Sequence, residues 1–284
     1  HMTEIFTGAA LLYFVGFGLM CLKVKEGDYP PPPENVDGRS GFRSSLKTYM
    51  VECYSIRFYW FMFAMTTFHM VALGATTMFN LFFLKEIGLT PGDYGRIAGY
   101  ASIISMVLTY PAGIIADKYH PLRVQLVVKG ILLIFIPLNL IFLFVKMPPE
   151  TTYYYYMAVT MVSLPAAVLY GASMFPTEMR IFPKDRFGQF CSAQALVRSV
   201  GVILGSLLIG GLFDLLKWGY HGSDYAYRWF PAIIWVIEIL AFLCLVQVYR
   251  GWKKYGGLEH YQPPMPEKCV KDSLPSPGIP EAVS

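Results

Sequence analysis

Polar and charged residues recur at helical spacing inside apolar stretches of this chain. The residues whose chemistry suits the binding of a polar solute are His69, Asn80, Tyr170, Gln194 and Arg198. His69, Gln194 and Arg198 each lie about ten residues, or roughly 15 Å of helix, from one end of their stretch. An arginine at the centre of a membrane costs about 2.5–3.5 kcal/mol even on the mildest scales, so it needs a charged partner or a water-filled cavity.

Two roles are open for the deepest charges. Glu238 lies near the middle of the last apolar stretch, and a helical hairpin joins that stretch to the one that holds Arg198. Glu238 can therefore form a structural pair with Arg198, or it can serve as an ion-coupling carboxylate. The hydroxyl and glycine residues can face a polar cavity, or they can serve helix packing alone. Small residues let helices approach closely in lipid, and serine or threonine can bond its own helix.

The elements that carry these residues are seven apolar spans, each close to the roughly 20 residues that cross the hydrocarbon core as a helix. They cover residues 4–22, 58–84, 92–116, 123–145, 153–175, 188–212 and 229–249. The chain is 55% hydrophobic and only 15% charged, which excludes an ordinary soluble domain. The sequence therefore predicts an all-α fold, a polytopic membrane bundle of seven transmembrane helices.

Lysine and arginine fall mostly on one side of these spans. With the first residue placed outside, the inner segments are 23–57, 117–129, 176–187 and 250–284. They hold 17 basic residues against five in the outer segments, and only Arg198 belongs to neither set. Because positive residues favour the cytoplasmic side, we expect an integral multi-pass protein of the plasma (inner) membrane, with its N-terminus outside and its C-terminus in the cytoplasm.

The spans and loops divide the chain into four regions. These are a first transmembrane helix at 1–22, a cytoplasmic linker at 23–57, a six-helix bundle at 58–250 and a disordered cytoplasmic tail at 251–284. Within the linker, apolar residues recur every three or four positions from Phe42 to Ile56, which predicts an amphipathic helix along the inner membrane surface. The alternative is that the second span simply begins early.

Four of the seven spans carry a continuous stripe of polar or small residues. These are the spans at 58–84, 92–116, 153–175 and 188–212. The other three have only isolated polar residues, namely Asn139, Glu238 and Gln247. We therefore expect the four striped helices to line a polar cavity or to pack on one another through their stripes.

Two loops resemble those of a known family. The turn after the third span reads Gly113-Ile-Ile-Ala-Asp117-Lys118, with Arg123 just beyond it. This resembles the cytoplasmic loop signature of the major facilitator superfamily, which is a glycine, three residues, an aspartate and a basic residue, followed by a basic cluster. The family's equivalent later loop is similar to the run Pro176, Glu178, Arg180, Pro183, Arg186 and Gly188. The order of spans over residues 4–250 resembles helices six to twelve of the family's twelve.

The resemblance implies the C-terminal half of a secondary transporter that works by alternating access, without the first five helices. It implies that the five residues named first contact the substrate and that Gly113, Asp117, Lys118 and Arg123 form a cytoplasmic gate. Gly113 would allow a close helix crossing there. The expected partners are the lipid bilayer, a missing N-terminal helical half, and a small polar organic solute with a co-transported proton or sodium ion. No cofactor and no nucleic acid are expected.

The class of solute stays open at this point. The second loop is similar to that of glycoside and disaccharide cation symporters, and tyrosine and glutamine suit a sugar. Arg198 equally suits a carboxylate or a phosphate.

A seven-helix membrane receptor or scaffold without transport activity is the alternative that the topology permits. The short outer loops, the lack of an outer cysteine pair and the signature loop count against it. An enzyme has no support in the sequence, which shows no metal-ligand cluster, no nucleophile with a base and no phosphate-binding loop.

Overall fold

The computed structural model describes residues 2–23 and 42–265, and every regular element within those two ranges is a helix. The chain divides into two compact units, residues 1–45 and 46–284. The first unit holds α1 (Met2–Lys23), whose length of 22 residues suits a membrane span. The stretch Ala10–Lys23 of this helix is apolar.

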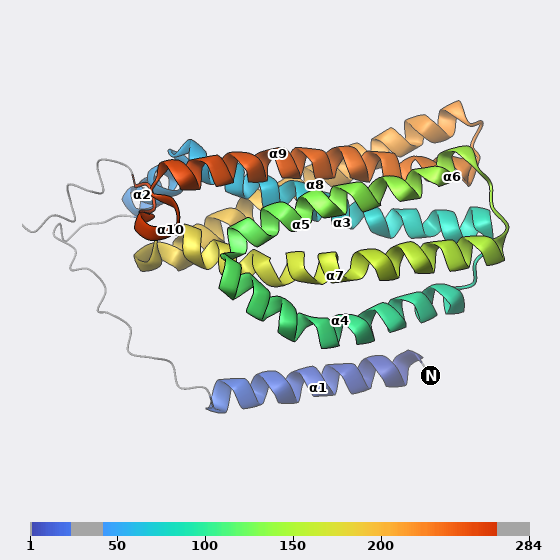
Figure 1. The fold of residues 1–284 in the computed structure, drawn as a ribbon, viewed down its shortest axis with the longest axis horizontal. Coiled ribbons are helices and arrows are strands. Elements are labelled where there is room, and N and C mark those ends of the chain that lie inside the picture. Colours follow the sequence, from blue (N-terminus) through green and yellow to red (C-terminus); the bar gives the residue numbers. More distant parts are fainter. Residues whose placement is uncertain (1, 24–41, 266–284) are drawn as a thin grey trace, which may run out of the picture. The chain divides into compact units, whose positions relative to one another are not determined.

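The second unit is a helical bundle (Figure 1). Its longer helices are α2 (Phe42–Tyr54, which begins in the first unit), α3 (Arg57–Phe82), α4 (Pro91–Tyr119), α5 (Pro121–Phe135), α7 (Pro149–Ile181), α8 (Phe187–Gly219) and α9 (Phe230–Lys254). Its short elements are a π-helical turn Phe83–Ile87, 3-10 turns Ile136–Leu140, Lys184–Arg186 and Asp224–Trp229, and the helices α6 (Ile141–Phe144) and α10 (Gly257–His260). Six helical stretches here are long and apolar enough to cross a membrane. With α1 they account for the seven predicted spans.

Local sequence explains where several helices begin and bend. Thr90 caps α4, because its hydroxyl accepts a hydrogen bond from the Asp93 amide while the Asp93 carboxylate accepts one from the Thr90 amide. Pro91 occupies the first helical position, where no amide donor is needed. Pro137 lies in the 3-10 turn that separates α5 from α6, which is the bend its missing donor predicts.

The bundle is held by pairwise helix packing. Helix α3 packs against α9 and α8, α7 packs against α4 and α5, and α5 also contacts α9. The crossing of α3 and α8 depends on two glycines. A β-carbon at Gly201 would clash with Thr67, and one at Gly205 would lie 2.7–2.8 Å from the methyl groups of Val71. The stripe of small residues on α8 therefore serves close packing on α3 at these two positions.

We expect Gly201→Ala to lower the free energy of unfolding by about 1–3 kcal/mol, because the added methyl group overpacks the α3–α8 crossing. Thermal unfolding in detergent micelles measures the change. Gly211→Ala on the same helix is the control, since a β-carbon there meets no atom within 4 Å. Alanine's better helix propensity should leave that variant unchanged or slightly more stable. Equal shifts in both variants would show that the crossing is not tight.

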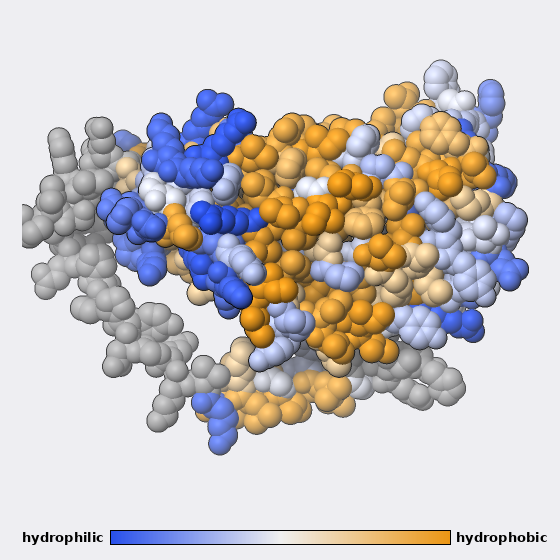
Figure 2. Space-filling model, viewed as in Figure 1, coloured by the Kyte–Doolittle hydropathy of each residue, from blue (hydrophilic) through white to orange (hydrophobic). Residues whose placement is uncertain are grey.

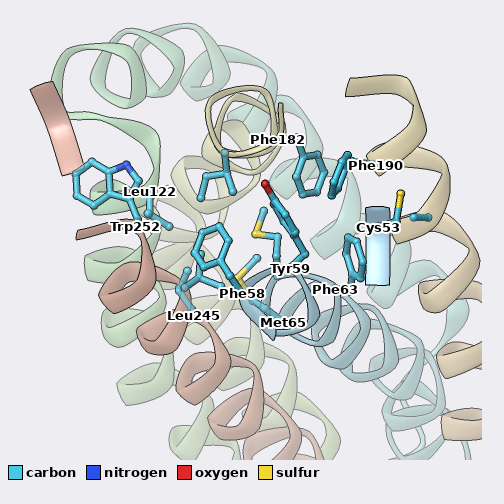
Figure 3. Packing of buried hydrophobic residues seen from close by; sticks show 14 residues of the cluster. Cys53, Phe58, Tyr59, Phe63, Met65, Leu122, Phe182, Phe190, Leu245 and Trp252 are labelled. Atoms are coloured by element: carbon cyan, nitrogen blue, oxygen red, sulfur yellow. The ribbon is translucent and has the colours of Figure 1, made fainter. Parts of the chain in front are cut away.

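Two aromatic cores lie at opposite ends of the bundle. At one end Tyr59 lies among Phe182, Phe190 and Phe63, with ring centroids 4.5 Å apart for Tyr59 and Phe190 (Figure 3). At the other end the core consists of Phe79, Phe82, Phe83, Phe142, Phe213 and Phe230 with smaller neighbours. The polar residues of the bundle's middle lie between these two cores.

The surface of the bundle agrees with a membrane position. One face of the second unit is hydrophobic over its middle, and hydrophilic residues gather at its two ends (Figure 2). Large apolar side chains of the second unit remain well exposed, among them Ile134, Phe144 and Leu208 at 72%, 84% and 74%. An exposed apolar area of this extent requires lipid or another protein to cover it.

The predicted amphipathic helix is present, but its described part docks on α8. Helix α2 ends at Tyr54, and Ile56 is extended before α3 begins, so the second span does not start early. Glu52 is buried, forms an ion pair with Arg186 and accepts a hydrogen bond of 2.8 Å from Gln189. The Tyr54 hydroxyl donates to the carbonyl of Ala193 at 3.3 Å.

This docking should protect the Cys53 thiol. Burial, followed by the charge of Glu52, raises the pKa of Cys53 to about 11, so the thiolate is scarce at pH 8 and increases only as the pH rises towards 11. In a variant whose only cysteine is Cys53, we expect N-ethylmaleimide to react roughly 100-fold more slowly than in the denatured chain. Arg186→Ala should release α2 and raise the rate. An unchanged rate would contradict the docking.

The C-terminal region differs from the expectation of a disordered tail from residue 251. Helix α9 continues to Lys254, and the chain folds back through α10. The Tyr261 hydroxyl donates to the carbonyl of Ile181 at 2.8 Å, and the Tyr59 hydroxyl donates to the carbonyl of Pro264 at 3.0 Å. Residues 251–265 are thus ordered on the bundle because their polar groups are satisfied there. Residues 266–284 lie outside the described part of the chain.

Candidate ion-coupling and substrate site

A lysine, a histidine and a glutamate from three different helices meet in the middle of the bundle. Lys129 of α5 forms an ion pair with the Oε2 atom of Glu238 on α9. The Nδ1 atom of His69 on α3 lies 3.0 Å from Glu238 Oε1 and 3.0 Å from Lys129 Nζ. Lys129 is only 2% exposed and Glu238 only 7%. Three ionisable groups are therefore in mutual contact with almost no access to bulk water.

A tyrosine from a fourth helix completes this group. The ring of Tyr170 on α7 meets the His69 ring edge-on, with centroids 4.9 Å apart. Lys129 Nζ lies 4.4 Å from the centroid of the same ring, within the range of a cation–π interaction. We call His69, Lys129, Tyr170 and Glu238 the charged cluster. It joins α3, α5, α7 and α9.

A cavity of about 300 Å³ adjoins the charged cluster. Beyond His69, Lys129 and Glu238 its polar lining consists of Thr76, Asn139, Tyr156 and Ser163. Leucine, isoleucine and phenylalanine side chains form most of the rest. The Oδ1 atom of Asn139 is buried without a hydrogen-bond partner among the described residues, so it requires a water or a ligand.

The cavity extends towards one end of the bundle. Two of the lining residues, Thr76 and Asn139, come after His69 and Lys129 in the chain, along helices that run towards this end. Helix α7 begins at this end, and Tyr156 lies near its start. The chain turns here at Gly88, Met147 and Gly222, so we call it the predicted outer end, after the charge bias.

Glu238 does not form the structural pair with Arg198 that its position suggested. Its carboxylate is held by Lys129 and His69. Lys129 was counted with the inner segment 117–129 although it also lies within the predicted span 123–145, so the count of inner basic residues included a residue of that span. The turn before it contains a single residue, because α4 ends at Tyr119 and α5 begins at Pro121. The proline at the first helical position is the signal that would have placed Lys129 two turns inside the helix.

Gln194 and Arg198 lie together on α8, apart from the charged cluster. The side-chain amide of Gln194 donates to Thr66 Oγ1 at 3.1 Å and to Glu178 Oε1 at 3.0 Å. Arg198 is half-buried one turn further along, and its charge acts on the carboxylate of Glu178. Glu178 was not selected from the sequence because it was placed in a loop, whereas α7 continues to Ile181.

Asn80 belongs neither to the charged cluster nor to the group of Gln194 and Arg198. It is half-buried near the end of α3, and it does not line the cavity beside the charged cluster. Of the five predicted substrate residues, the structure therefore joins His69 with Tyr170, and Gln194 with Arg198, while Asn80 lies alone. Their roles stay predictions.

The predicted gate residues lie around the turn between α4 and α5. Asp117 pairs with Arg180 at 3.8 Å, Lys118 lies over the Tyr119 ring at 5.4 Å, and Arg123 lies over the Trp252 ring at 5.5 Å. The close helix crossing expected at Gly113 is absent within the described chain, since a β-carbon there would meet no atom within 4 Å. The gating function stays a prediction.

His120 forms the turn itself and was not selected from the sequence. It has a φ of 70°, is buried, and packs on Trp252 with ring centroids 4.7 Å apart. Burial, and then the nearby charges of Arg180 and Arg123, lower the pKa of His120 to about 4. The turn is therefore fixed by a neutral imidazole at neutral pH.

An apolar helical bundle with ionisable groups joined at mid-depth defines an integral, multi-pass membrane protein in which the charges have a function or a partner. The sequence model of the Major Facilitator Superfamily matches residues 2–206. The chain therefore belongs to this superfamily of membrane transporters. No curated protein and no solved structure matches it.

Proposed function

We propose that this chain acts in a secondary active transporter that moves a small polar organic solute by alternating access, coupled to a cation. The observation that carries the proposal is the charged cluster. A carboxylate that is held by two nitrogen groups at mid-depth, next to a cavity, can exchange its partners when a cation binds. Glu238 is the coupling residue in this proposal.

The solute contact in this proposal is Arg198 of α8. The guanidinium group of Arg198 offers a planar pair of donors that suits two oxygen atoms of a sugar, a carboxylate or a phosphate. The half-buried Arg198, beside the carboxylate of Glu178, supports this assignment.

The orientation is part of the proposal. With Lys129 moved into a span, 16 basic residues remain in the inner segments against five in the outer ones. This bias still supports an outer N-terminus and a cytoplasmic C-terminus in a plasma membrane. The gate at Asp117, Lys118 and Arg123 then lies on the cytoplasmic side.

The test uses the full-length protein in liposomes. Radiolabelled disaccharides, glycosides, monocarboxylates and organic phosphates are offered under an imposed proton gradient and, separately, a sodium gradient. We expect one class to accumulate, and Glu238→Gln to abolish gradient-driven accumulation. The exposed Glu259→Gln is the matched control and should behave as wild type. Wild-type accumulation by Glu238→Gln would remove the coupling role, and no uptake of any solute above protein-free liposomes would contradict the proposed transport.

A further inference from the structure

The hydrogen bonds of the charged cluster can be formed with either of two numbers of protons. His69 Nδ1 can either carry a hydrogen and donate it, or offer a lone pair and accept. It lies 3.0 Å from the carboxylate oxygen of Glu238 and equally close to Lys129 Nζ. As a donor it bonds to an ionised Glu238, and as an acceptor it bonds to a protonated Glu238. Its single lone pair cannot also accept from Lys129, which is paired with the other carboxylate oxygen.

The cluster can therefore gain or lose one proton with little movement of its atoms. With neutral Glu238, its hydroxyl group donates to His69 Nδ1 and Lys129 donates to the other carboxyl oxygen. With ionised Glu238, His69 donates to one carboxylate oxygen and Lys129 to the other. The groups that face Glu238 are His69 from α3 and Lys129 from α5, and Tyr170 from α7 lies against both of these. The proton belongs to the cluster as a whole.

A metal cation fits this site poorly. Sodium, like other hard cations, is bound by several oxygen atoms. Both oxygen atoms of Glu238 are already contacted by nitrogen groups, and an ammonium group would have to be displaced first. A proton needs no such displacement.

The cavity supplies a path to this proton. It begins at His69, Lys129 and Glu238 and continues past Ser163 and Asn139 towards the predicted outer end. The buried Asn139 Oδ1, which has no partner in the described part of the chain, favours water in this space. Four helices of one bundle enclose the path, so it is separate from Arg198 and Gln194 on α8.

We propose that the coupled cation is H⁺ and that it reaches Glu238 from the predicted outer end through water in this cavity, between α3, α5, α7 and α9. Only the statement that this proton is coupled to solute movement rests on the proposed function. The proton site and its path are properties of the bundle whether or not a solute is moved.

Cysteine labelling of the full-length protein in oriented vesicles tests the path. In a background without native cysteines, single cysteines replace Leu133, which lines the cavity, and Ile134, its 72%-exposed neighbour that points away from it. Ser163→Cys is a second cavity position with almost no change in size. Gly222→Cys and Glu259→Cys report the two ends of the bundle. The probe is a small, charged, impermeant methanethiosulfonate.

We expect Leu133→Cys and Ser163→Cys to react from the same side as Gly222→Cys, roughly tenfold or more faster than Ile134→Cys, because only a thiol in contact with water forms thiolate. Reaction from the side of Glu259→Cys, or at the rate of Ile134→Cys, would overturn the path. If the cysteines react as expected but no solute is taken up, the proposed function is overturned and the path still stands.

Infrared difference spectra over a pH titration test the proton itself. We expect a carbonyl stretch of a protonated carboxyl group that titrates, that Glu238→Gln removes and Glu259→Gln retains, and that sodium chloride does not shift relative to choline chloride. A band that sodium displaces would overturn the assignment of the cation as H⁺, as would a spectrum that Glu238→Gln leaves unchanged.

Discussion

Lys129→Met should lower the free energy of unfolding of the full-length protein by about 3–5 kcal/mol, because it leaves the buried Glu238 carboxylate without its cation. Glu238→Gln should cost stability for the converse reason. Unfolding in detergent, followed by circular dichroism over a temperature ramp, measures both. Lys254→Met is the control, since this residue lies at the exposed end of α9.

The double variant Lys129→Met/Glu238→Gln should recover much of the loss, since neither charge is then left alone. It should not recover gradient-driven transport, because the proton site is gone. Losses that simply add in the double variant would show that the two residues do not form a pair. A double variant that also regains coupled transport would remove Glu238 from the mechanism.

Arg198→Lys should reduce transport strongly while folding survives. Lysine keeps the charge but loses the planar pair of donors, and one or two lost charge-assisted hydrogen bonds correspond to about a 10- to 100-fold fall in kcat/KM. Initial rates of uptake per folded protein measure this. Arg250→Lys at the predicted inner end is the control. A fall in melting temperature with unchanged uptake would assign Arg198 to the structural partnership with Glu178 instead.

The helices themselves could be predicted from the sequence because the bilayer fixes their length. Each apolar stretch of about 20 residues has only one way to satisfy its backbone in lipid. The Thr90 cap could equally be predicted from the sequence, because Thr90, Pro91 and Asp93 act on the helix that they begin. The predicted span at 123–145 began two residues after α5 does, but the inner segment before it was extended to residue 129. A single residue, His120, makes the turn, and hydropathy averages across a turn that short.

The charged cluster could not be predicted as a unit for a different reason. Helical periodicity compares residues within one helix, and α5 and α9 each contribute few ionisable residues to the middle of the bundle. Lys129 and Glu238 are separated by more than a hundred positions in sequence, so only the packing of α5 on α9 brings them together. A helix without a polar stripe can therefore still contribute to a polar site.

The stripe on α8 teaches the opposite lesson. Gln194, Gly201 and Gly205 share a helical face, as a stripe that lines a cavity would, but all three meet α3. Spacing cannot distinguish a glycine that leaves room for a solute from one that leaves room for a neighbouring helix. The side chain opposite decides, and here it is Thr67 or Val71.

The two aromatic cores have a mechanical consequence. They hold α3, α7, α8 and α9 together at both ends, and the segment through Tyr261 and Pro264 adds a contact to α3 and α7. A bundle fastened at both ends moves as one body. If the proposed alternating access is correct, distances between spin labels on these four helices should stay constant through the transport cycle.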